Sequence, residues 1–103
     1  MPTASDNGVI DRQRCVDLLA GRSVGRIAWR AADGIQILPV TYSWYQDSIV
    51  FRTSPYGVLS ELVREADVAF EVDQLDESSR SGWSVVVRGR AAATAAPEGL
   101  RRL

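Results

Sequence analysis

A short run of alternating apolar and polar residues, "DVAFEVD" at 67–73, constrains the fold of this chain most. Val68, Phe70 and Val72 fall on one side of the run, and Glu71 falls on the other. A period of two residues is typical of a strand with one buried face. Comparable runs rich in β-branched and aromatic residues indicate further strands at 26–30, 35–45, 48–52 and 83–91. The sequence therefore predicts a mainly β protein.

Turn signals between these runs predict antiparallel neighbours. Asp33-Gly34 is a strong hairpin signal, and Gln46-Asp47 separates the next two strands. We expect an antiparallel meander that curls toward a barrel. The polar stretch 74–82 is predicted as a loop.

Two or three short helices complete the predicted fold. Asp11 is a candidate N-cap, Ile10 and Cys15 have the spacing of a hydrophobic staple, and Gly21 is a candidate stop. These signals predict a helix over about Arg12–Ala20, with Cys15 in the core. A second helix is predicted to begin near Pro55, and the tail from 96 resembles the first turn of a third.

A chain of 103 residues is predicted to form a single domain over 10–103, preceded by a flexible leader over 1–9. An open sheet of five strands would leave its edges exposed. Either a partner subunit covers these edges, or the natural chain continues past Leu103 and the C-terminal end is truncated.

Composition excludes several classes of protein. The net charge of −1 argues against a nucleic-acid partner, and no apolar run is long enough to span a bilayer. No secretory signal is recognisable, so we expect a cytoplasmic protein without membrane attachment. One cysteine allows no internal disulfide, and it cannot supply a zinc cluster, so we expect no metal site.

The sequence contains no histidine and no lysine, and all 12 basic residues are arginine. Ser-His and Cys-His nucleophile pairs, Schiff-base lysines and P-loop lysines are therefore excluded. The carboxylates form no convincing catalytic pair, so catalytic residues stay unassigned. This composition favours either a bound cofactor that supplies the chemistry or a protein without catalysis.

Three segments are candidate binding sites, and each also has a purely structural interpretation. Arg52, Thr53 and Ser54 lie where a strand meets the predicted second helix, so they form either a phosphate cradle or an ordinary helix cap. Pro39 offers no ladder donor, so it marks an edge, a bulge or a break where backbone groups are open to a flat ligand.

The third segment is the strand that Trp83 opens. Arg88 and Arg90 lie on its opposite face, where they either pair with Glu71 and Asp73 across the sheet or contact a ligand.

Together, these segments have the order seen in one known family. The chain resembles the pyridoxamine 5'-phosphate oxidase-like family of flavin-binding split β-barrels. The resemblance runs from about Asp11 to Ala92 and lies in "CVDLLAGRSVGRIAW", "LPVTYSW", "VFRTSP" followed by "LSEL", "AFEVD" and "GWSVVVRGRA".

The resemblance implies an antiparallel split β-barrel of the FMN-binding type that lacks its last strand here. It implies a homodimer with flavin mononucleotide (FMN) between the subunits, and an oxidoreductase that transfers hydride to an unknown small-molecule substrate. The residues that it assigns to the cofactor are Pro39, Val40, Thr41, Tyr42, Arg52, Thr53, Ser54, Leu59, Trp83 and Ser84. Trp83 and Ser84 are expected to come from the other subunit.

The chain departs from the family pattern at one position. Relatives commonly have a lysine in a "GxKL"-like run, and Val58 stands at that position here. The pattern of the true vitamin B6 oxidases is not recognisable. The alternatives are therefore a deazaflavin-dependent reductase, a haem-binding relative, a non-catalytic or sensory cofactor-binding module, and a purely structural homodimer.

Overall fold

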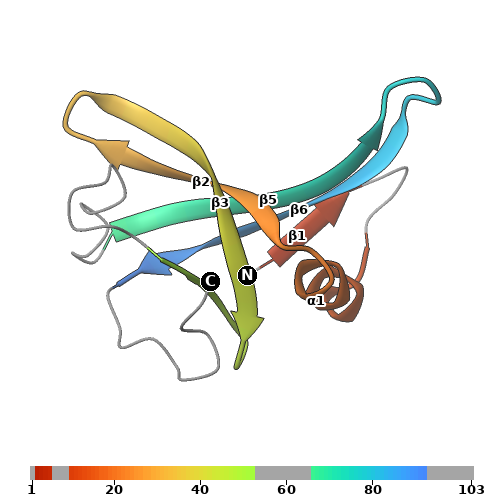
Figure 1. The fold of residues 1–103 in the computed structure, drawn as a ribbon, viewed down its shortest axis with the longest axis horizontal. Coiled ribbons are helices and arrows are strands. Elements are labelled where there is room, and N and C mark those ends of the chain that lie inside the picture. The colour runs from red at the N-terminus through yellow and green to blue at the C-terminus, as the bar shows by residue number, and fades with distance from the viewer. Residues whose placement is uncertain (1, 6–9, 53–65, 93–103) are drawn as a thin grey trace.

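A computed structural model describes residues 2–5, 10–52 and 66–92 of the chain. One helix and six strands lie in this part, and the strands form a single antiparallel sheet with the order β1-β6-β5-β2-β3-β4. Figure 1 shows the sheet strongly bent, with α1 beside its lower right part. The elements are β1 (Pro2–Ser5), α1 (Arg12–Ala20), β2 (Val24–Ala31), β3 (Gly34–Tyr45), β4 (Ser48–Phe51), β5 (Ala66–Asp76) and β6 (Ser81–Ala91).

Helix α1 has the bounds that the sequence predicts. The Asp11 carboxylate accepts a hydrogen bond from the Arg14 N–H at 2.8 Å, which satisfies one of the free donors of the first turn. Gly21 is the C-cap, and Cys15 and Leu19 are the buried side chains of the helix. The predicted core position of Cys15 is confirmed.

The strand β3 is long because it belongs to two ladders. Residues 34–41 pair with β2, whereas Tyr42–Tyr45 pair with β4. β5 then pairs with β2 rather than with β4, so the strands do not form the simple meander that we expected. The change of partner along β3 bends the sheet in the way of a split barrel, and the sheet is not closed within the described residues.

The core lies on one face of this sheet, and α1 packs against it. Its fully buried side chains include Leu19 of the helix and Ile27, Val72 and Val85 of the central strands. The Phe70 ring contacts the Tyr42 ring edge-on, with 4.8 Å between centroids. The Tyr42 hydroxyl donates a 2.5 Å hydrogen bond to the Leu19 carbonyl, which ties β3 to the helix.

Two sequence predictions on element bounds differ from the structure. The predicted loop 74–82 is shorter, because Gln74 pairs with Trp83 and Asp76 pairs with Ser81, leaving a turn of 77–80. Ladder hydrogen bonds continue the hairpin here despite the polar composition. Within the predicted leader, Pro2–Ser5 form β1 and pair with β6. The predicted second and third helices lie outside the described residues.

Candidate functional site

The outer edge of β3 is the first part of the candidate site. The Tyr42 N–H donates to the Ser23 carbonyl at 2.9 Å, so the backbone groups of even-numbered residues in β3 point toward β2. Those of Ile35, Ile37 and Pro39 therefore point away from β2. Within the described part of the chain, no ladder partner pairs with this side of β3 before Tyr42.

Pro39 fits this edge for a simple reason. It lies opposite Arg26 in the β2 ladder, and its missing N–H falls on the side without a ladder partner. The sequence prediction that Pro39 marks an edge is confirmed, while the β2 ladder continues past it without a break. The outward carbonyl of Pro39 and the backbone groups of Ile37 can bond the edge of a flat ligand.

The side chains of the other predicted β3 residues divide between the two faces. Val40 and Tyr42 are buried in the core, with exposures of 9% and 2%, so their side chains cannot contact a ligand at the edge. Burial raises the pKa of Tyr42 to about 12, and the hydroxyl stays protonated over the physiological range. Thr41 is exposed on the outer face, one residue before the β3–β4 ladder begins at Tyr42.

The predicted phosphate contact lies only partly within the described chain. Arg52 follows β4 directly and is exposed. Thr53, Ser54, Leu59 and Val58 lie outside the described residues, so their predicted roles stay predictions.

Trp83 and Ser84 lie elsewhere in the same sheet. β6 is separated from β3 by β5 and β2, which is three strand spacings or about 14 Å. Trp83 is partly buried and packs against the core, where the Arg22 guanidinium lies 5.6 Å from the centroid of its ring. One chain therefore does not bring Trp83 to the outer edge of β3.

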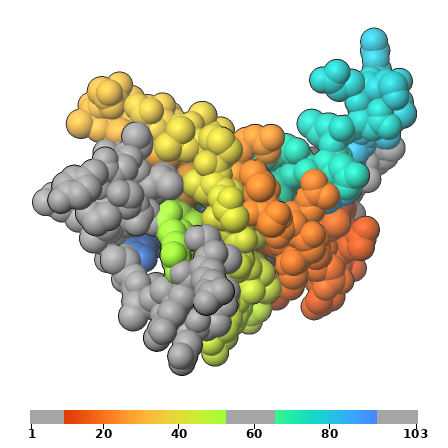
Figure 2. All heavy atoms as spheres, in the orientation of Figure 1, coloured from red at the N-terminus to blue at the C-terminus, as the bar shows by residue number. Residues whose placement is uncertain are grey.

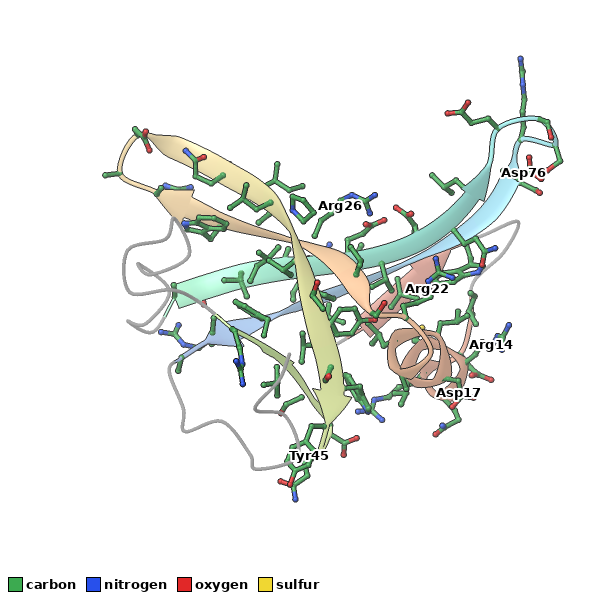
Figure 3. All side chains as sticks on the ribbon, in the orientation of Figure 1. Arg14, Asp17, Arg22, Arg26, Tyr45 and Asp76 are labelled. Carbon is green, nitrogen blue, oxygen red and sulfur yellow. The ribbon has the colours of Figure 1, made fainter. Side chains whose placement is uncertain are left out.

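The outer face of the sheet has a charged cluster that the sequence analysis did not predict. Arg26 of β2 pairs with Glu71 at 3.0 Å and with Asp73 at 3.3 Å. Partial burial, followed by the hydrogen bond and negative charge of Asp73, raises the pKa of Glu71 to about 7 against the opposing effect of Arg26. The labelled Arg26 side chain lies in the notch between the two hairpin arms in Figure 3.

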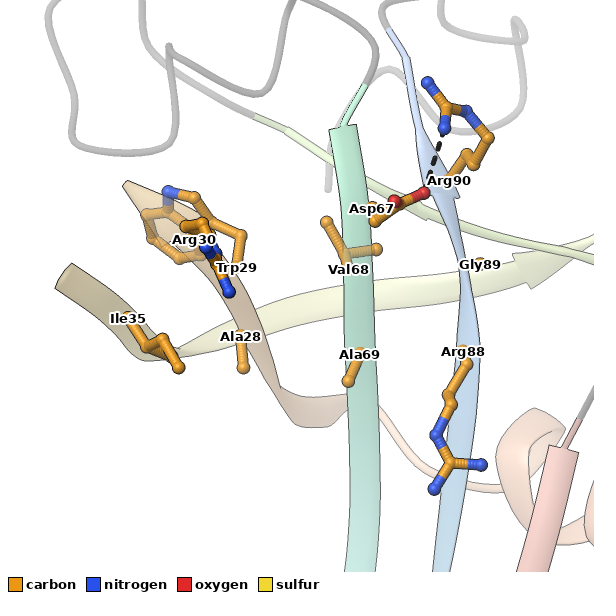
Figure 4. Close-up of a pocket in the computed structure, with 10 residues that line it drawn as sticks. All are labelled: Ala28, Trp29, Arg30, Ile35, Asp67, Val68, Ala69, Arg88, Gly89 and Arg90. Atoms are coloured by element: carbon orange, nitrogen blue, oxygen red, sulfur yellow. Dashed lines mark hydrogen bonds and ion pairs between the residues drawn. The ribbon is translucent and has the colours of Figure 1, made fainter. Parts of the chain in front are cut away.

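The ion pairs correct the predicted partner of Arg90 (Figure 4), whereas the pairing predicted for Arg88 stays a prediction. The register places Glu71 opposite Val86, and Arg90 pairs instead with Asp67 at 2.9 Å. Glu71 and Asp73 could have been assigned to Arg26 only with the pairing of β2 and β5 known, and alternation alone does not define that pairing.

Among residues 2–5, 10–52 and 66–92, no group of three or more metal-ligating side chains could hold a metal ion. The same part of the chain has no helix that is long and apolar enough to cross a membrane.

Comparisons with known proteins identify the family of this chain. The sequence profile of the pyridoxamine 5'-phosphate oxidase family matches residues 11–103. The chain therefore belongs to that family, and its fold is the family's antiparallel split β-barrel.

Three relatives show how far the similarity extends. An uncharacterised protein of Mycobacterium tuberculosis strain H37Rv is 37% identical over 98 residues, which is 90% of this chain and 64% of that protein. The FAD-binding protein of Mycobacterium smegmatis has a similar structure with a TM-score of 0.74 and 30% identity, covering 84% of this chain and 73% of that one. A putative pyridoxamine 5'-phosphate oxidase of Corynebacterium glutamicum has a TM-score of 0.62 and 29% identity, covering 84% and 63% of the two chains.

Proposed function

We propose that this chain is a flavin-binding protein that acts as an oxidoreductase, with the cofactor held between two copies of the chain. Support comes from the family, from the similar FAD-binding protein of Mycobacterium smegmatis, and from the outer edge of β3. The observation that carries the proposal is the row of outward backbone groups at Ile37 and Pro39, which precede the part of β3 that pairs with β4. Arg52 directly follows β4.

The residues of the chain fit a flavin better than a haem. Haem iron takes His, Cys, Met or Tyr as its axial ligand. The sequence has no histidine, and Cys15 is 1% exposed, so neither of these two ligand types is available; Met1 and the three tyrosines are the side chains left for that role. A flavin instead needs backbone partners for the edge of its ring and a cation for its phosphate, which the edge of β3 and Arg52 would supply. FMN is our first candidate, and FAD presents the same ring and the same first phosphate.

The cofactor also accounts for the composition of the chain. A bound flavin supplies the hydride chemistry, so the protein needs neither a histidine base nor a lysine nucleophile. The roles of this chain's own residues are to hold the ring edge through the β3 backbone and to neutralise the phosphate through Arg52. A deazaflavin would use the same edge of β3.

The same geometry supports a homodimer. The family resemblance assigns Trp83 to the cofactor, and Trp83 lies about three strand spacings from the outer edge of β3, so a second copy would supply it. The exposed apolar side chains also favour association, since monomers rarely present large apolar patches. These side chains belong to Val24, Ile35, Ile37, Tyr45 and Leu75, and by strand alternation all of them lie on the outer face.

The test of this proposal is the affinity for FMN, measured by fluorescence quenching of the flavin. Arg52→Ala removes one charge-assisted contact, so we expect the dissociation constant to rise by roughly 10- to 100-fold. Arg12→Ala removes the same charge from the exposed start of α1 and should leave the affinity unchanged. Equal affinities for the wild type and Arg52→Ala would show that the proposed phosphate contact is wrong.

A second candidate function is a cofactor-binding or sensory module without turnover. Val58 in place of the family's usual lysine favours it. The distinguishing measurement is hydride transfer from the reduced, flavin-saturated protein to a panel of quinones, nitroaromatics and enones. Tight flavin binding with no reoxidation by any acceptor would support the module and contradict the oxidoreductase.

A further inference from the structure

The Trp83 side chain lies near the start of β6, where the β5–β6 hairpin extends beyond the strands that pair with β2 (Figure 1). The ring packs against the core but is only partly buried, so part of it is open to a second molecule. Several rotamers are accessible to a partly exposed side chain unless its neighbours restrict it. The backbone before Trp83, its cross-strand neighbour and an arginine over its ring all do so.

Gly82 fixes the backbone before Trp83. Its φ of +154° lies in the region that favours glycine. A Cβ at this position would collide with the Gln74 carbonyl oxygen and would lie 2.9 Å from Cα of Leu75. The two strands therefore approach closely here, and the ladder places Trp83 directly opposite Gln74.

Arg22 holds the ring from the side of the helix. Its guanidinium carbon lies 5.6 Å from the centroid of the Trp83 ring, which is within the range of a cation–π contact. Nη1 of the same guanidinium donates a 3.3 Å hydrogen bond to Oε1 of Gln74, the residue opposite Trp83. One side chain therefore contacts both members of a cross-strand pair, and Figure 3 shows it between α1 and the β5–β6 hairpin.

The position of Arg22 is tied to the core because this residue follows the end of α1 directly. Gly21 is the C-cap of the helix, and the Arg22 N–H donates to the Leu19 carbonyl at 3.4 Å. The same carbonyl accepts the buried hydrogen bond of Tyr42, which ties this end of the helix to β3. The end of α1, the guanidinium and the indole are therefore linked in one continuous set of contacts.

Charge neutralisation does not explain where the Arg22 side chain lies, because its contacts are a neutral amide and an aromatic ring. The effect of these contacts is to restrict an indole that is partly open to other molecules. An aromatic side chain that is already held in place loses less entropy when it binds. The arrangement is therefore typical of a binding residue supported by its neighbours.

We propose that Arg22 is a positioning residue that holds the Trp83 ring in place for contact with the flavin of a second copy. The inference rests on the proposed function, in which a second copy supplies Trp83 to the cofactor. Arg22 acts through the indole and needs no contact of its own with the flavin.

The order of the Trp83 ring is measured first, without any cofactor. Fluorine NMR of the whole protein labelled with 5-fluorotryptophan gives signals from its three tryptophans, and Trp83→Phe identifies the signal of Trp83. In Arg22→Gln we expect this signal to sharpen and to shift toward that of free fluorotryptophan, because the ring loses its restraint. Arg12→Gln removes the same charge at the exposed start of α1 and should leave the signal unchanged. An identical Trp83 signal in the wild type and in Arg22→Gln would overturn the inference.

The effect on the site is then measured as the affinity for FMN, with circular dichroism to show that each variant keeps the wild-type fold. Arg22→Gln should raise the dissociation constant by roughly two- to fivefold, the size of one exposed cation–π contact. Arg22→Lys keeps a cation over the ring and should restore most of the affinity. Unchanged affinity in Arg22→Gln, with FMN bound by the wild type, would overturn the inference and leave the proposed function standing. A wild type that binds no FMN would contradict the proposed function, and the inference with it.

Discussion

The two faces of the sheet are built from the same strands but use their residues differently. On the core face, Ile27, Val72 and Val85 are at most 1% exposed. On the outer face, Ile35 and Ile37 of β3 and Leu75 of β5 are 63–76% exposed. The ion pairs of Arg26 with Glu71 and Asp73 lie on the same face. Figure 2 shows the outer face as a saddle between the arms formed by the β2–β3 and β5–β6 hairpins.

This difference shows which apolar residues serve folding and which serve contacts with other molecules. Burial of the core face accounts for the fold, because apolar area removed from water is the main stabilising term. The apolar residues of the outer face add nothing to the stability of a single chain. Their presence is explained if this face contacts another copy or a ligand.

The largest effect should come from the closest packing on the core face. A Cβ added at Gly25 would lie 2.3 Å from Cζ of Phe70 and 2.9 Å from the Glu71 carbonyl oxygen. We expect Gly25→Ala to lower the free energy of unfolding by about 3 kcal/mol, measured by urea denaturation. A Cβ at Gly89 meets nothing within 4 Å, so Gly89→Ala should change the stability by less than about 0.5 kcal/mol. Equal effects in the two variants would contradict the packing described for Gly25.

A smaller loss of stability is expected when Tyr42, which joins β3 to α1, is changed. Tyr42→Phe removes the buried hydrogen bond to the Leu19 carbonyl, which also accepts a long 3.4 Å hydrogen bond from the Arg22 N–H. We expect a loss of about 1 kcal/mol in urea denaturation. Tyr45→Phe is the matched control, because Tyr45 is 39% exposed on the outer face. A loss in Tyr45→Phe as large as that in Tyr42→Phe would show that the two faces do not differ as described.

The charged cluster of the outer face should give the protein a distinct pH dependence. The pKa of Glu71 is raised from 4.5 to about 7, so between these values the folded chain holds a proton that the unfolded chain has lost. The stabilisation from Glu71 is therefore complete below pH 4.5 and is lost as the pH rises through about 7. The loss should be on the order of 1 to 2 kcal/mol, because partial exposure of the group weakens the effect.

The measurement is the unfolding free energy of the wild type and of Glu71→Gln at several pH values between 4 and 8. The difference between the two proteins isolates Glu71 from the other carboxylates. The unfolding free energy of the wild type, relative to that of Glu71→Gln, should fall as the pH rises. A difference that is independent of pH would show that Glu71 titrates normally.

The smallest effect on folding, and the clearest effect on association, is expected at Ile37. This side chain is 63% exposed, so Ile37→Thr should change the unfolding free energy of the single chain by less than about 0.5 kcal/mol. If two copies meet through the outer face, the same substitution weakens the dimer. Analytical ultracentrifugation would check this, and an unchanged dimerisation constant would exclude Ile37 from the interface.

Local signals in the sequence predicted the elements that burial and capping control. Asp11, Ile10 and Gly21 defined the helix, and the alternation around Phe70 defined the strand that crosses the core. The extension of the β5–β6 hairpin was not predictable, because its residues are polar and only ladder hydrogen bonds hold them. Likewise, the small residues of Pro2–Ser5 have no alternation, so nothing indicated β1.

The candidate site was predictable only where one residue's chemistry determined its place. Pro39 lacks a donor, so an edge, a bulge or a break was expected, and an edge was found. The partner of Arg90 depended on strand register, which periodicity does not define, and Asp67 was missed as that partner.

The central claim is that this chain binds a flavin, and the visible absorption spectrum tests it most directly. The untagged protein would be purified without added cofactor and then titrated with FMN and, separately, with FAD. The account predicts an absorption band of protein-bound flavin that saturates at one flavin per chain. A colourless protein that takes up neither flavin would contradict it.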